Sequence, residues 1–133
     1  MKRHAAVFAA LFVMAGTVPV PAHHSFTNFW FMDREVEITG VVKAVKLVNP
    51  HSELSIEVAS GPQAGMWYIT SRATGSGLRR GGWTPETLPV GTVVTVSGNP
   101  SRKEGAKALA AGTITLPDGK KLSFGGAEGI PQG

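Results

Sequence analysis

The sequence predicts a small, mostly β domain of five or six short strands, and two observations carry this prediction. Seventeen glycines and nine prolines divide the chain into short apolar runs, a spacing typical of strands joined by turns. Within a run, apolar and polar residues alternate: Leu54, Ile56 and Val58 are separated by polar side chains, starting from Glu53 and including Glu57. Such alternation places one face of a strand against a core and the other face in water.

Three strands are expected in the first half of the domain. Residues 36–48 form a long first strand, in which Gly40 marks a bulge or a sharp bend. Pro50 ends that strand, because proline donates no ladder hydrogen bond. Residues 53–58 form the second strand, and residues 66–70 form a third, antiparallel to the second.

A short helix is expected between the third and fourth strands. The glycines of residues 73–82 indicate a loop, and the helix is predicted to begin at Thr84. Threonine can cap a helix, Pro85 suits the first helical position, and the carboxylate of Glu86 favours the positive end. One or two turns would end near Leu88.

The remaining strands complete a recognisable layout. Residues 91–98 and 108–116 form the fourth and fifth strands, and residues 121–124 return as a short sixth strand after a hairpin turn at Asp118-Gly119. A three-strand meander, a helix and two further strands are the layout of an oligonucleotide/oligosaccharide-binding (OB) barrel. The prediction is therefore an OB-like barrel, although two curled sheets or another small barrel would give a similar pattern.

Residues 1–22 have the pattern of a secretory signal peptide. A basic start at Lys2 and Arg3 precedes an apolar run, and Val20 and Ala22 are small residues at the expected cleavage site. The apolar run is shorter than the roughly 20 residues that span a bilayer. We therefore expect a periplasmic or secreted protein with no transmembrane segment after cleavage.

Cleavage would leave 111 of the 133 residues, which suits one domain over residues 23–124 with a disordered tail over residues 125–133. Losing two basic residues lowers their number from 13 to 11 against nine acidic ones. A net charge of +2 argues against a nucleic-acid partner. The absence of cysteine excludes thiolate metal sites and cysteine nucleophiles.

Histidines supply the sharpest functional hypothesis. Cleavage after Ala22 would place His23 and His24 at the new N-terminus. The free amine and the imidazole of a first-position histidine can chelate one metal ion, and nitrogen ligands of this kind suit Cu(II). His24 or His51 would add a further nitrogen, so the predicted metal ligands are His23, His24 and His51. The alternative is a polar, flexible tag at a frayed terminus.

His51 also has a simpler interpretation. It lies in an Asn49-Pro50-His51-Ser52 segment where one strand turns into the next. Asparagine and proline are ordinary turn residues, so Asn49 can satisfy backbone groups while His51 is hydrogen-bonded at the start of a strand.

Aromatic and basic residues define two candidate interaction surfaces. A dense apolar segment follows the histidines and includes Phe26, Phe29 and Trp30. It could dock a partner or an apolar ligand, or it could pack onto the barrel and close one end. A basic loop with Arg79, Arg80 and Trp83 could meet an anion or a lipid headgroup, or it could be a solvated loop with one buried indole.

These features favour a binding protein over an enzyme. The sequence has no nucleophile–base set, phosphate loop or zinc-protease motif. The leading hypothesis is a small periplasmic binding protein for Cu(II). The alternative is a metal-free interaction module that docks onto another protein of the cell envelope.

Several motifs together carry a resemblance to a known family. They are His-His-Ser-Phe at 23–26, Asn-Pro-His-Ser at 49–52, Leu-Arg-Arg-Gly-Gly-Trp at 78–83 and Leu-Pro-Asp-Gly-Lys at 116–120. From His23 to about Phe124 the chain resembles a family of small exported bacterial proteins of unknown function. The resemblance implies an envelope location and a small β domain, and it brings no established activity.

The same resemblance bears on the site residues. It places His23, His24 and His51 on recurring histidine positions of the family. Family members carry an aspartate just after the aromatic residue of the N-terminal segment, whereas this chain has Phe31 there and Asp33 two residues later. If that acid helps to bind a ligand, the site in this chain is altered.

Overall fold

The computed structural model describes residues 26–125, which form a β barrel with two short helices. The elements in chain order are α1 (Phe26–Phe29), β1 (Val36–Lys46), β2 (Glu53–Val58), β3 (Gly65–Ser71), α2 (Gly75–Arg80), β4 (Val93–Pro100), β5 (Ala108–Thr115) and β6 (Lys121–Ser123). The predicted signal peptide, His23, His24 and most of the predicted tail lie outside the described residues. No helix within residues 26–125 has the length and apolar character needed to cross a membrane.

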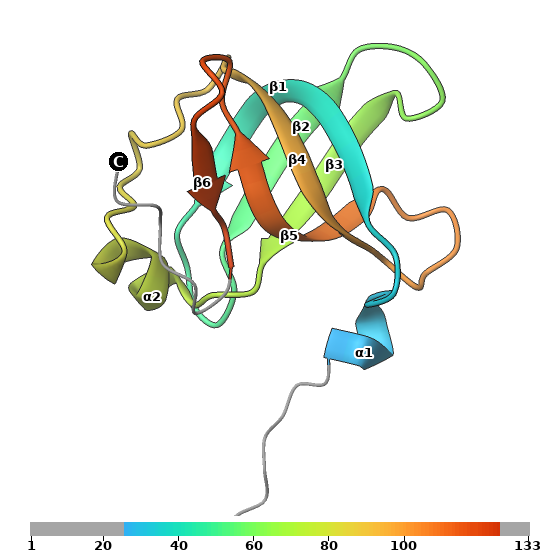
Figure 1. The fold of residues 1–133 in the computed structure, drawn as a ribbon, viewed down its shortest axis with the longest axis horizontal. Coiled ribbons are helices and arrows are strands. Elements are labelled where there is room, and N and C mark those ends of the chain that lie inside the picture. Colours follow the sequence, from blue (N-terminus) through green and yellow to red (C-terminus); the bar gives the residue numbers. More distant parts are fainter. Residues whose placement is uncertain (1–25, 126–133) are drawn as a thin grey trace, which may run out of the picture.

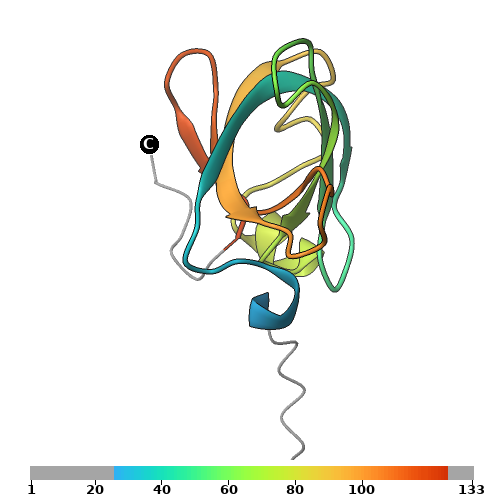
Figure 2. The same ribbon diagram turned by 90° about the vertical axis from the view of Figure 1, so that its right-hand side faces the viewer.

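Strand pairing closes the barrel in the OB order. The sheet runs β3-β2-β1-β4-β5-β6 with antiparallel neighbours, and a parallel pairing of β3 with β5 joins its two sides. Five strands therefore form a closed ring, and β6 extends β5 as an additional strand. Figures 1 and 2 show the strands curving around the barrel with α1 beyond one end. The prediction of an OB-like barrel with a short helix between the third and fourth strands is confirmed.

The long first strand serves both sides of the barrel. Its first half pairs with β4 from Val36 to Val41, and its second half pairs with β2 from Val41 to Lys46. Gly40 lies at the change of partner, where a Cβ atom would be 2.5 Å from the carbonyl oxygen of Glu57. A glycine is needed here because only a residue without a side chain allows the two backbones to approach so closely. The irregularity in the β1–β2 register lies two to four residues later, between Val42 and Ala44, and not at Gly40 itself.

The core follows the alternation in the sequence. In β2, Leu54 and Ile56 are fully buried and Val58 is nearly so, whereas Glu53 and Glu57 are exposed, as predicted. The two carboxylates face Lys46 and Lys43 of β1 across the outer surface of the sheet. The largest fully buried side chains come from all five barrel strands and from the segments after α2 and β6: Trp83, Phe124, Ile38, Leu54, Ile56, Ile69, Leu88, Leu109, Ile114, Val42, Val94 and Val96.

The short helix begins earlier than predicted. Residues 84–88 form turns, so the prediction of a helix there is wrong, and α2 occupies the segment that was expected to be a loop. Thr74 caps α2 by accepting a hydrogen bond from the Gly77 amide, and Leu78 enters the core. Thr84 does accept from the Glu86 amide, but the turn ends at once. A local capping signal does not start a helix by itself, because nucleating the first turn is costly.

We expect Gly40→Ala to lower the free energy of unfolding by about 1–3 kcal/mol, because the added Cβ meets backbone rather than a movable side chain. Gly112→Ala is the matched control, since that strand glycine has no atom within 4 Å of an added Cβ and no positive φ. It should be neutral or slightly stabilising. Urea unfolding of both variants measures the difference, and equal stabilities would contradict the role assigned to Gly40.

Candidate functional site

A groove of about 610 Å³ lies at the end of the barrel next to α1. Its walls come from α1 and Trp30, from the β1–β2 loop, from Thr70 of β3 and from the β4–β5 loop. The lining residues are Phe26, Asn28, Phe29, Trp30, Pro50, His51, Thr70, Ser101, Arg102 and Lys103. Its volume is in the range of small-molecule sites in proteins, which is about 300–1,000 Å³.

The β4–β5 loop holds α1 in place through backbone groups. The Nε of Arg102 donates to the carbonyl oxygens of Thr27 and Trp30 at 2.7 and 3.2 Å. The Arg102 amide donates to the carbonyl oxygen of Phe29 at 2.8 Å, and Trp30 forms an antiparallel bridge with Ser101. These contacts fix one wall of the groove, although no residue of α1 is itself buried.

Phe31 anchors the segment that joins α1 to β1. The guanidinium groups of Arg34 and Arg102 both lie over its ring, with central carbons 4.1 and 4.5 Å from the ring centroid. The Phe31 amide donates to the carbonyl oxygen of Pro100, and the Phe31 carbonyl oxygen accepts from the side-chain amide of Asn99. Two cation–π contacts and two hydrogen bonds therefore restrain the chain directly after Trp30.

Helix α2 positions the β1–β2 loop. The Asn49 side chain accepts a hydrogen bond from the Ser76 amide and donates to the Ser76 hydroxyl, both at 3.0 Å. Gly75 approaches so closely that an added Cβ would lie 2.7 Å from the carbonyl oxygen of Val48. Arg79 donates to the carbonyl oxygen of Leu47 at 2.6 Å. Asn49 therefore accepts from a backbone amide, as the turn interpretation predicts. That amide belongs to Ser76 of α2, however, and not to the turn itself.

Two buried serines attach the C-terminal end of the β1–β2 loop to the end of β3. The Ser52 amide donates to the Ser71 hydroxyl at 2.7 Å, and the Ser71 amide donates to the carbonyl oxygen of Ser52 at 2.9 Å. The Ser71 hydroxyl donates in turn to the carbonyl oxygen of Ala73, and both serine side chains are fully buried. His51 is thus attached to a rigid support on its C-terminal side.

His51 is half-buried in the groove wall, and the Phe26 ring meets it edge-on with 5.3 Å between the ring centroids. Its Nδ1 atom is buried and has no hydrogen-bond partner among residues 26–125. An imidazole nitrogen without a partner costs free energy, on the order of 1–3 kcal/mol for a buried polar group. The simpler interpretation, a His51 that is hydrogen-bonded at the start of a strand, finds no partner for this atom in the described part of the chain.

The sequence-predicted ligands are brought together only in part. His51 lies in the groove, whereas His23 and His24 precede the described residues. Within residues 26–125 no group of three or more His, Cys, Asp or Glu side chains is placed to hold a metal ion. A metal site at His51 would therefore need ligands from the N-terminal segment or from outside the chain.

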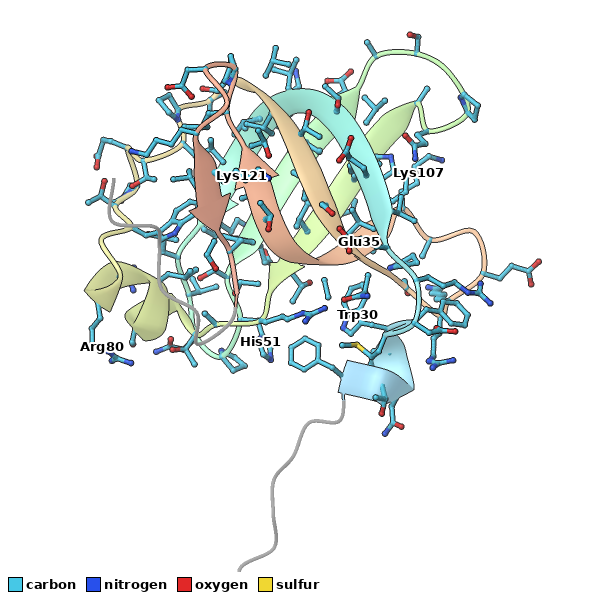
Figure 3. The ribbon with its side chains drawn as sticks, viewed as in Figure 1. Trp30, Glu35, His51, Arg80, Lys107 and Lys121 are labelled. Atoms are coloured by element: carbon cyan, nitrogen blue, oxygen red, sulfur yellow. The ribbon has the colours of Figure 1, made fainter. Side chains whose placement is uncertain are left out.

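The second predicted interaction surface consists of one core residue, Trp83, and two exposed arginines, Arg79 and Arg80. Trp83 is only 2% exposed, and its indole N–H donates to the carbonyl oxygen of Ser123 at 3.0 Å. It is a core residue and cannot form part of an interaction surface. Arg80 is exposed on α2, on the far side of His51 from Trp30 in Figure 3, and neither Arg79 nor Arg80 lines the groove.

Sequence reasoning missed the β4–β5 loop. Ser101, Arg102 and Lys103 line the groove together with Asn28 and Thr70, and none of them carries a recognisable motif. The fold prediction contained the signal, because OB barrels use the β1–β2 and β4–β5 loops at one end as their ligand face.

A family model for DUF6152, described as a family of unknown function, matches residues 10–110. The chain belongs to this family. The match spans the three histidines and both groove-lining loops, and it confirms the expectation of an uncharacterised family. No curated protein matches the chain at a significant level.

We expect Ser71→Ala to lower the free energy of unfolding by about 1–3 kcal/mol, because the buried Ser52 amide would lose its acceptor. Ser55→Ala, on the half-buried outer face of β2, should change stability by less than about 0.5 kcal/mol. Thermal or urea unfolding measures both. Equal effects would show that the serine pair does not stabilise the loop that carries His51.

Proposed function

We propose that this DUF6152 protein is a small ligand-binding protein of the cell envelope that takes Cu(II) at the groove containing His51. The ligands would be the terminal amine and imidazole of His23, with His24 or His51 supplying a further nitrogen. The observation that carries the proposal is the edge-on contact between Phe26 and His51. Phe26 is the first residue that the structure describes, so the segment with His23 and His24 joins the domain beside the His51 imidazole.

Chain length supports this arrangement. His24 precedes Phe26 by two residues and His23 by three. Because an extended chain spans at most about 3.6 Å per residue, the Cα atoms of these histidines lie within about 7 and 11 Å of the Phe26 Cα. Both imidazoles can therefore reach the His51 ring without any change in α1.

The chemistry of the donors also fits. Amine and imidazole nitrogens suit Cu(II), which has the highest affinity in the divalent series. His51 lines the groove, and its buried Nδ1 atom has no hydrogen-bond partner within residues 26–125. The ligand face of OB barrels lies at this end of the fold, which favours a binding role as an analogy at the level of the fold.

We expect protein that begins at His23 to bind one Cu(II) ion, and a form whose His23 amine is acetylated to bind about tenfold or more weakly, because the blocked amine can no longer share a chelate ring with the imidazole. His51→Ala should also weaken binding, whereas Asn28→Ala, a change in the same groove that removes no imidazole, should leave it unchanged. Competition titration with a copper chelator measures these affinities.

Two results would reject the copper site. Equal affinity of the acetylated and free-amine forms would exclude the terminal amine as a ligand. An exported protein whose natural N-terminus is not His23, as read by mass spectrometry, would remove the chelating pair altogether.

One observation favours the alternative of a metal-free interaction module for an envelope protein. Phe29 is 63% exposed beside the groove, and exposed aromatic side chains are common at binding surfaces. This alternative predicts that replacing His23, His24 and His51 by alanine leaves function intact, whereas Phe29→Ala abolishes capture of the partner.

A further inference from the structure

The groove combines aromatic walls with a basic rim, and this combination points to a ligand other than a metal ion. Phe26, Phe29 and Trp30 supply ring surface on one side. Arg102 and Lys103 supply positive charge at the β4–β5 loop, and none of the described lining residues is acidic. A ligand that complements this surface has a flat apolar body and one negative charge.

The two cations have different roles. Arg102 uses its Nε to hold the backbone of α1 and stacks its guanidinium on Phe31, so it builds the wall. Lys103 is exposed, and its ammonium has no hydrogen-bond or ion-pair partner within residues 26–125. It is therefore available to an anion without breaking an existing contact.

The aromatic wall favours a ring over an aliphatic chain. Phe29 presents most of its side chain to solvent, and Trp30 is half-buried with its backbone fixed by the bridge to Ser101. Offset or edge-on contacts between aromatic rings contribute about 0.5–1.5 kcal/mol beyond the area they bury. Figure 3 shows Trp30 and His51 at the same end of the barrel beside α1, whereas Lys107 and Lys121 lie away from it.

We propose that the groove binds a small aromatic carboxylate, with the ring against Phe29 and Trp30 and the carboxylate at Lys103. The inference rests on the binding role proposed above but not on copper, because no residue in it is a nitrogen ligand of the metal. It assigns a class of ligand to the groove, and it makes Lys103 the residue that selects for a carboxylate.

The test uses the exported protein in EDTA, so that copper cannot contribute, with 2-naphthoate as the probe. Calorimetric titration is expected to give saturable binding of one 2-naphthoate per chain, and the neutral analogue 2-naphthylmethanol should bind about threefold to tenfold more weakly. Lys103→Gln should remove that preference for the carboxylate. Lys107→Gln is the matched control, an exposed lysine that does not line the groove.

A second variant tests the aromatic wall. Phe29→Ala should weaken binding of both probes by about tenfold, since an exposed side chain can be removed without loss of the fold. Absence of saturable 2-naphthoate binding would overturn the proposal. Equal affinities for the two probes, or equal effects of Lys103→Gln and Lys107→Gln, would also overturn it. None of these results would alter the copper titration, so the two proposals fail independently.

Discussion

The barrel depends on one kind of steric constraint, the close approach of two backbones at a glycine, which occurs at Gly40 between β1 and β2 and at Gly98 between β4 and β5. At Gly40 the carbonyl oxygen of Glu57 lies 2.5 Å from the place of a Cβ, at the point where β1 changes its pairing from β4 to β2. That double pairing brings the two sides of the sheet close enough for β3 and β5 to join in parallel. Because the strands then form a ring, the β1–β2 and β4–β5 loops meet at the same end of the barrel, and the groove exists between them.

Different contacts hold two walls of the groove in place. On the β1–β2 side, Asn49 is tied to α2, and Ser52 and Ser71 satisfy each other in the interior. On the α1 side, a one-turn helix too short to be stable alone is held by the backbone contacts of Arg102. These contacts of the β1–β2 loop place His51 where the Phe26 ring meets it, and the buried Nδ1 atom of His51 has no partner within the described residues.

Local patterns predicted the strands well and the helix poorly. Leu54, Ile56 and Val58 identify their strand because the period of two is a property of the chain itself. Thr84 accepts a hydrogen bond from the Glu86 amide and still starts no helix, although Leu88 four residues later is buried in the core. Trp83 shows the same limit: an indole in a basic loop has the composition of a surface, but its N–H reaches the carbonyl oxygen of Ser123 inside the protein.

The sequence by itself determined where the strands lie along the chain, the hairpin turn after β5 and the candidacy of His51, because each depends on residues that are neighbours along the chain. Only the tertiary structure decided that Lys103 and Arg102 share a groove with His51 and Phe26, and that Trp83 belongs to the core. These facts depend on contacts between distant segments, which arise when the parallel β3–β5 pairing closes the ring. No local pattern of residues specifies that the ring of strands closes, so the set of residues that lines the groove could not be predicted from the sequence alone.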